Sequence, residues 1–162
     1  MEVCVLPHVT IEAVILAPLL IVQITLFPFV ASMMSSKWAD STWKITLEEA
    51  GSQMANTIQQ LYLSFNRAEV SAGTMIQAST FPAEISGQAY IATGSLNWSL
   101  TQSSGKILVL NLTLQKTGVR ATVRTPLGPN VLWDEQSLFD SSSPNASIKV
   151  RKFVDGTLLF SF

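Results

Sequence analysis

The first part of the chain is an almost unbroken run of apolar positions. Residues 13–34 are interrupted only by Gln23, Thr25, Ser32 and two prolines. A helix needs about 20 apolar residues to cross the roughly 30 Å hydrocarbon core of a bilayer. Residues 1–36 are therefore predicted to contain an apolar helix long enough to span a membrane.

A second pattern follows, in which apolar residues recur at steps of three and four. They are Ile45, Leu47, Ala50, Met54, Ile58, Leu61, Tyr62 and Phe65. This spacing predicts an amphipathic helix from about residue 42 to 66, with its apolar face packed on the rest of the protein. Residues 37–41 are either a short break, with Asp40 and Ser41 as capping residues, or a continuation of the first helix. We expect a continuation.

From residue 69 onward the apolar residues alternate with polar ones. Leu108, Leu110, Leu112 and Leu114 alternate with Val109, Asn111 and Thr113, and after a turn at 116–118, Val119, Ala121 and Val123 alternate with Arg120, Thr122 and Arg124. Because successive strand residues point to opposite faces, this pattern predicts a hairpin with one buried and one solvated face.

Turn residues divide this region into short strands. Asp155-Gly156 predicts a two-residue hairpin turn, and residues 125–130 and 140–145 have the composition of loops. With strand-like stretches at 88–92 and 96–100, the pattern indicates six to eight short strands. The predicted class is α+β: a long apolar helix continuing into an amphipathic helix, then a small antiparallel β-sandwich or barrel.

Composition narrows the classes of partner. Of 162 residues, 48% are hydrophobic and only 13% are charged, against ~25% in typical soluble domains. The net charge of -1 provides no basic face, so nucleic acid is not an expected partner. Cys4 and His8 are the only cysteine and histidine, too few for a zinc site. We expect no metal and no cofactor.

No residue pattern points to an enzyme. Glu48-Glu49 and Asp134-Glu135 are adjacent in sequence, so their side chains diverge and do not form a facing acid–base pair. The tryptophans are expected to have structural roles and not to form a binding site. Trp38 and Trp43 lie where an interfacial aromatic belt would fall, whereas Trp98 and Trp133 are expected in the core.

The apolar helix contains residues that a bilayer tolerates poorly. Pro18 and Pro28 each remove a helical hydrogen bond, which in lipid requires neighbouring groups to satisfy the freed carbonyls. Glu12 is either a carboxylate that reaches the headgroups at the membrane interface or one that pairs with a cation on a neighbouring subunit. These three residues are the predicted assembly residues of the helix.

The distribution of basic residues bears on topology. No lysine or arginine precedes Lys37, so this is not the pattern of an intact signal peptide. Taken alone, Lys37 and Lys44 would place the following domain in the cytoplasm. We expect instead that a basic leader preceding Met1 is removed and that the domain faces outward.

Three sequons support that orientation. Asn97-Trp-Ser, Asn111-Leu-Thr and Asn145-Ala-Ser match the acceptor pattern for N-linked glycans. Around Asn97 and Asn111 the asparagine and the hydroxyl residue share the polar face of a predicted strand. If glycans are attached there, the β domain lies outside the cell.

The stretch "TIEAVILAPLLIV" resembles the N-terminal signature of the type IV pilin superfamily, and the Glu12–Pro18 spacing in "EAVILAP" is close to its TadE-like branch. The continuation through "FPAEISGQAYIATGS" (81–95) resembles archaeal type IV pilin-like proteins. In that family the precursor is cut just before the apolar segment. Counted from His8, Glu12 is the fifth residue, as in the bacterial pattern, although "LP" precedes His8 where Gly or Ala is usual.

The resemblance implies a structural subunit that is inserted in the membrane and then polymerises with copies of itself. Residues 1–36 would form the filament core, 37–67 the amphipathic continuation and 68–162 the outer β domain of an extracellular filament. The alternative is a monomeric membrane-anchored domain with an extracellular binding or adhesion role. A lone anchor, however, would gain nothing from Glu12, Pro18 and Pro28.

Overall fold

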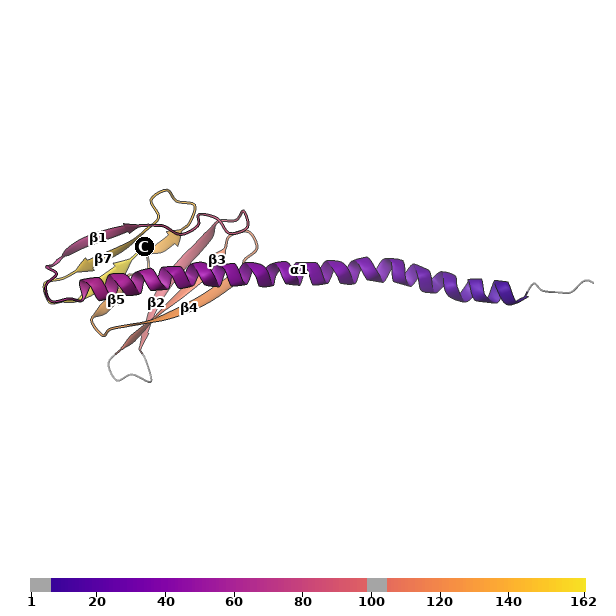
Figure 1. Ribbon diagram of the computed structural model, residues 1–162, viewed down its shortest axis with the longest axis horizontal. Helices are drawn as coiled ribbons and strands as arrows, with labels where there is room; N and C mark the ends of the chain where they lie inside the picture. The colour runs from indigo at the N-terminus through magenta and orange to yellow at the C-terminus, as the bar shows by residue number, and fades with distance from the viewer. Residues whose placement is uncertain (1–6, 99–104) are drawn as a thin grey trace, which may run out of the picture. The chain divides into compact units, whose positions relative to one another are not determined.

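The computed structural model describes residues 7–98 and 105–162, with side chains described from Leu16 onward. A long helix, α1 (Pro7–Phe65), is followed by eight strands in the described residues (Figure 1). The strands are β1 (Gly73–Ala78), β2 (Tyr90–Trp98), β3 (Lys106–Leu114), β4 (Arg120–Leu127), β5 (Val131–Trp133), β6 (Leu138–Asp140), β7 (Ser147–Lys152) and β8 (Leu158–Ser161). The predicted α+β class is confirmed.

The chain forms two compact units, the first ending at Ser41 and the second comprising Thr42–Phe162. Helix α1 contributes to both. It continues without interruption through residues 37–41 and through both prolines. The expected continuation of the apolar helix into the amphipathic one is therefore confirmed.

In the second unit the helix buries one stripe of side chains against the sheets. The fully or nearly fully buried residues are Leu47, Ala50, Met54, Ala55, Ile58 and Leu61. The prediction for Ile45 was wrong, because its side chain is 63% exposed. Successive helical residues turn by about 100°, so a residue two positions before Leu47 lies on the opposite side of the helix.

The strands form two four-stranded sheets, with orders β1-β7-β8-β5 and β4-β3-β2-β6. The β3–β4 hairpin has the predicted register: Leu108, Leu110 and Leu112 are completely buried while Asn111 is exposed. One pairing departs from the expected antiparallel arrangement. Strand β5 runs parallel to β8, an arrangement that their long connection in the sequence permits.

Two local predictions were wrong at the turns. The β7–β8 connection is a three-residue loop, since Phe153 N–H bonds to the Thr157 carbonyl at 2.9 Å and Gly156 occupies a positive φ of 85°. This is a turn followed by a glycine bulge and not the two-residue turn expected for Asp155-Gly156. The predicted loop at 125–130 begins later, because strand β4 extends to Leu127. Pro126 is tolerated there since β4 is an edge strand.

Aromatic side chains fill the space between the sheets. Phe139 and Phe162 pack edge to face at 5.5 Å between ring centroids, and Trp133 stacks on Phe160 at 6.5 Å. The Trp133 indole lies against Gly94 of β2, where a Cβ would otherwise be. The expected core position of Trp133 is confirmed, since it is only 8% exposed.

Two other tryptophans are not where the sequence suggested. Trp98 was expected in the core but is 71% exposed. It is the last residue of β2, and only the residues nearer the start of that strand are buried on the inward face. The ammonium of Lys106 lies 5.1 Å from the centroid of its ring. Trp43, assigned to an interfacial belt, is half-buried against the core, because it precedes Leu47 by one helical turn.

Candidate functional site: the apolar half of helix α1

The first unit exposes its apolar side chains on every side of the helix. Twelve large hydrophobic residues between Leu16 and Met34 are 47–78% exposed, with Phe27 the most exposed of them. None of the most apolar 18-residue window is buried, and its mean hydropathy is 2.0. A soluble monomer rarely exposes so large a contiguous apolar surface, so this surface is the strongest functional feature of the described chain.

The dimensions of this segment suit a bilayer. Residues 13–36 contain no charged side chain, and at the rise of an α-helix they are about 36 Å long. The hydrocarbon core of a membrane is roughly 30 Å thick. By length and composition, the helix is compatible with insertion into a membrane.

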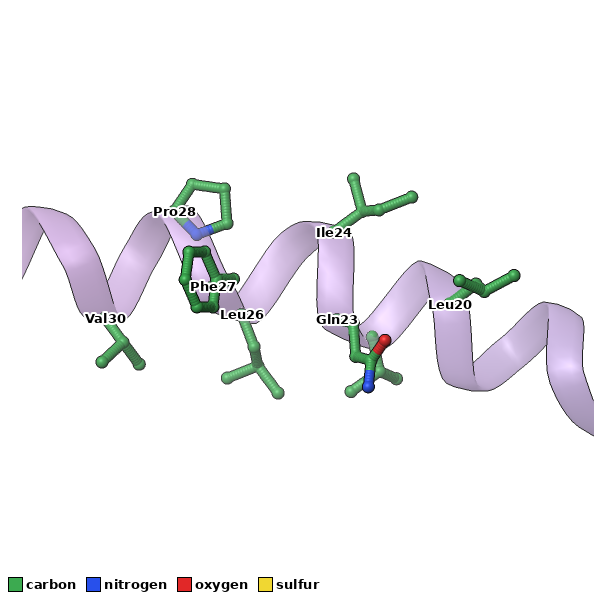
Figure 2. Close-up of a pocket in the computed structure, with 8 residues that line it drawn as sticks. Leu20, Gln23, Ile24, Leu26, Phe27, Pro28 and Val30 are labelled. Carbon is green, nitrogen blue, oxygen red and sulfur yellow. The ribbon is translucent and has the colours of Figure 1, made fainter.

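Figure 2 shows the middle of this segment, around Pro28. The side chains that line the hollow there, from Leu20 to Val30, all belong to α1 itself. With no second wall, the hollow is a groove between side chains on an exposed helix and cannot enclose a small molecule. It offers a shape into which side chains of a neighbouring helix can pack.

The polar groups in this segment differ in how they are satisfied. The Thr25 hydroxyl donates to the carbonyls of Ile21 and Val22, at 2.9 and 3.1 Å, so its polarity is met within the helix. The Gln23 amide has no hydrogen-bond partner among the described residues. Pro28 has no N–H to donate to the carbonyl of Ile24. An unpartnered amide and a freed carbonyl are therefore adjacent in the apolar segment.

The other predicted assembly residues lie nearer the start of the helix. The backbone of Glu12 belongs to α1, but its side chain lies outside the described residues, so its pairing stays a prediction. Pro18 lies within α1 as well and has no N–H for the carbonyl of Val14. Sequence reasoning did not single out Gln23, although an amide within an apolar run was a visible signal.

The three sequon asparagines are all exposed. Asn111 lies in the middle of β3, and its Oδ1 accepts a hydrogen bond from Thr122 Oγ1 at 2.9 Å. Asn145 lies in the loop between β6 and β7, whereas Asn97 lies near the end of β2. Ser99, the hydroxyl residue of the first sequon, lies outside the described residues. Each asparagine side chain is thus accessible to a bulky substituent.

Several ionisable groups of the second unit have structural partners. Glu48 lies 3.8 Å from Lys44, one helical turn away. Hydrogen bonds from Ser142 lower the pKa of the Asp140 carboxyl, and hydrogen bonds from Thr157 lower that of Asp155. Each carboxylate thereby stabilises its own turn. Within the described ranges, no three His, Cys, Asp or Glu side chains gather as metal ligands would.

Comparisons of the chain with protein-family models, with curated proteins and with solved structures find no match. Function is therefore inferred from the chain's own residues. The candidate site is the uncharged apolar surface of α1, together with Gln23 and the carbonyl of Ile24.

Proposed function

We propose that this chain is a structural subunit, a pilin, that polymerises through its apolar N-terminal helix into an extracellular filament like a type IV pilus. The observation that carries the proposal is the exposed apolar surface between Leu16 and Met34. Water does not solvate such a surface well, and a bundle of identical helices would bury it. The β unit would form the outside of the filament.

Burial of this surface is a large driving force. Each Leu, Ile or Phe side chain contributes about 1.5–3 kcal/mol when fully buried, and twelve large apolar side chains are available in the segment. Ordering of the subunits and of their side chains opposes association. Burial of these side chains therefore favours assembly outside a membrane.

The polar groups of the segment distinguish a helix bundle from a lone anchor. Lipid tails offer no donor to the freed carbonyl of Ile24 and no acceptor to the Gln23 amide. A neighbouring copy aligned at the same level would offer both, through its own Gln23 and the carbonyl of its Ile24. Glu12 is proposed to pair with a cationic group of the next subunit in the same way.

Before assembly the same helix would hold the subunit in a membrane, with the β unit facing outward. N-linked glycans on Asn97, Asn111 and Asn145 would then project from the filament surface. We propose no catalytic activity and no cofactor. The resemblance of residues 81–95 to archaeal type IV pilin-like proteins suggests an archaeal source of such filaments and a role at the cell surface, for instance in adhesion.

The test is the physical form in which the protein leaves the cell. Shearing of expressing cells without detergent should release the chain as high-mass fibres, visible by negative-stain electron microscopy. Recovery only as a monomer from detergent-solubilised membranes would contradict the proposal and support the alternative, a membrane-anchored extracellular binding domain.

Glu12→Gln separates membrane insertion from assembly. The variant retains the shape of the side chain and loses its charge, so fibre yield should fall while the amount of protein in the membrane fraction stays the same. A fibre yield equal to that of the unaltered chain would reject the proposed charge pairing.

A further inference from the structure

The free edges of the two sheets are protected unequally. An edge strand exposes unpaired N–H and C=O groups, and proteins usually block such edges with charge, proline or short length. Strands β5 and β6 have only three residues each. Strand β4 has Arg120, Arg124 and Pro126. Each of these three edges is therefore poorly suited to pair with another strand.

Strand β1 has none of these protections. Its sequence, GTMIQA, contains no charge and no proline over six residues. It lies at the end of its sheet and pairs only with β7, from Gly73↔Lys152 to Ala78↔Ser147 (Figure 1). Within the described residues, the backbone groups of 73–78 that point away from β7 have no hydrogen-bond partner.

The side chains of β1 are also unusually exposed. Five of its six residues are exposed, and Ile76 and Met75 are 61% and 40% exposed. In β2 and β3 the residues of one face are buried against the core, whereas β1 leaves apolar side chains on both faces in contact with solvent. An additional strand beside β1 would satisfy its outward backbone groups and place its own side chains against those of Met75 and Ile76 on each face.

The charge pattern favours a second copy of the chain as the partner, because β1 is uncharged and so meets no repulsion from an identical strand. Two identical strands that pair antiparallel about a two-fold axis place residues at equal distances on either side of the axis opposite each other, so like charges spaced along one strand meet across the pair. In β4 such pairing would bring Arg120 and Arg124 near their counterparts, but β1 has no charge to repel. The nearest cations are Lys149, Arg151 and Lys152 of β7. They would lie about 14 Å or more from those of the partner, three strand spacings away. At that distance salt largely screens their repulsion.

We propose that β1 is a self-association edge, through which two copies of this chain join their β1 strands antiparallel. The β1-β7-β8-β5 sheet of one copy and the same sheet of the other copy then form one continuous eight-stranded sheet. This contact uses no residue of the apolar helix, so it does not depend on the proposed filament. It would link helix-anchored subunits laterally through their β units.

Disulfide trapping tests the contact in the full chain, held in detergent micelles in a Cys4→Ser background. Single cysteines are placed at Thr74, Met75, Ile76 and Gln77, and the samples are oxidised and separated on a non-reducing gel. We expect a disulfide-linked dimer from the positions nearest the two-fold axis and much less from their neighbours. Leu132→Cys on β5 and Leu138→Cys on β6, which are 47% and 52% exposed, are matched controls that should stay monomeric.

A variant that adds charge to β1 provides a second test of the contact. Ile76→Lys places an ammonium group near the middle of each β1 strand and should abolish the dimer trapped by a cysteine at Met75, whereas Leu132→Lys should not. Because both side chains are largely exposed, neither change threatens folding, which circular dichroism verifies. Equal trapping at β1, β5 and β6 would indicate association through the helix alone and overturn the proposal. Absence of trapping at all four β1 positions would overturn it as well.

Discussion

The ammonium group of Lys152, on β7, donates a hydrogen bond to the main-chain carbonyl of Phe65, the last residue of α1, at 2.9 Å. A second hydrogen bond, at 2.7 Å, reaches the carbonyl of Arg67. The last turn of a helix leaves its carbonyls without intrahelical donors and concentrates partial negative charge. The last turn of α1 has no basic residue of its own. A residue far along the chain therefore caps the helix and attaches its end to the sheet.

Lys152→Met should destabilise the second unit by about 1–2 kcal/mol, because the carbonyls that Lys152 satisfies lose a charged donor while the apolar stem is retained. Chemical denaturation of the full chain in mild detergent measures the change in the free energy of unfolding. Lys149→Met is the matched control, since Lys149 is an exposed residue of the same strand. An equal effect from both changes would show that the helix cap contributes nothing specific.

Gly94→Ala tests the packing between the sheets. A Cβ at this position would occupy space filled by the Trp133 indole, so the ring must shift, at a cost of about 1–3 kcal/mol. Denaturation should show the loss of stability, and the tryptophan fluorescence spectrum should change. Gly73→Ala is the control, because no atom lies within 4 Å of its added Cβ. A neutral Gly94→Ala would mean that the two sheets are less closely packed there.

The neighbouring residues Leu112 and Asn111 report on strand register. Leu112 is fully buried, so Leu112→Ala should cost about 2–5 kcal/mol from lost burial and the resulting cavity. Asn111→Gln should cost little, because its side chain is exposed, and it should remove any glycan at that site. Thermal melts measure the first effect and intact mass the second. Greater destabilisation by Asn111→Gln would mean that β3 is inverted.

Tyr90 should make stability depend on alkaline pH. Burial raises the pKa of Tyr90 from 10.0 to about 12, and its hydroxyl has no hydrogen-bond partner in the described part of the chain. Between these values the unfolded chain has lost the phenolic proton and the folded chain retains it. The contribution of the protonated Tyr90 to folding stability is therefore complete below pH 10 and is lost as the pH rises through about 12. Denaturation at several pH values gives the free energy of unfolding of the unaltered chain and of Tyr90→Phe. The difference between the two is the contribution of Tyr90 ionisation. Curves of unfolding free energy against pH that run parallel for the two proteins would exclude this contribution.

Gln23→Leu tests the polar contacts proposed for the filament core. The change should lower fibre yield, because the freed carbonyl of Ile24 loses its proposed donor on the neighbouring helix. Thr25→Val is the matched control, since the Thr25 hydroxyl is satisfied within its own helix and its removal should leave assembly intact. The measurement is the amount of sheared fibre relative to membrane-bound protein. Higher yield from Gln23→Leu would favour purely apolar helix packing.

Periodicity was sufficient to predict the helix and the β3–β4 hairpin, because in both a buried face repeats over many residues. The stripe from Leu47 to Leu61 and the alternation around Leu112 each give several independent indications of the same face. Single residues outside such a repeat were less predictable. Trp98 shares the inward direction of its strand but lies beyond the covering residues, which no local pattern reveals.

Short strands and contacts between distant residues could also not be predicted from the sequence. Strands β5 and β6 have three residues each, too few for alternation to be recognised, and the parallel pairing of β5 with β8 depends on tertiary packing. In β1 neither face is buried, so it has no apolar period. The candidate helix surface was predictable from composition, whereas the unpartnered state of Gln23 required the hydrogen bonds of the structure.

The hydrogen bond between Thr122 and Asn111 has a consequence for the order of events in biosynthesis. It occupies Oδ1 of Asn111 and leaves Nδ2, the atom that carries an N-linked sugar, without a hydrogen-bond partner among the described residues. Strand β3 is paired on both sides, with β2 and β4, so a transferase could not draw this segment into its own cleft once the sheet has formed. A sugar on Asn111 would have to be attached before β3 pairs, whereas the loop residue Asn145 would stay open to modification after folding. The fraction of chains with a glycan at Asn111, relative to Asn145, would then depend on how quickly β3 pairs with β2 and β4 during folding.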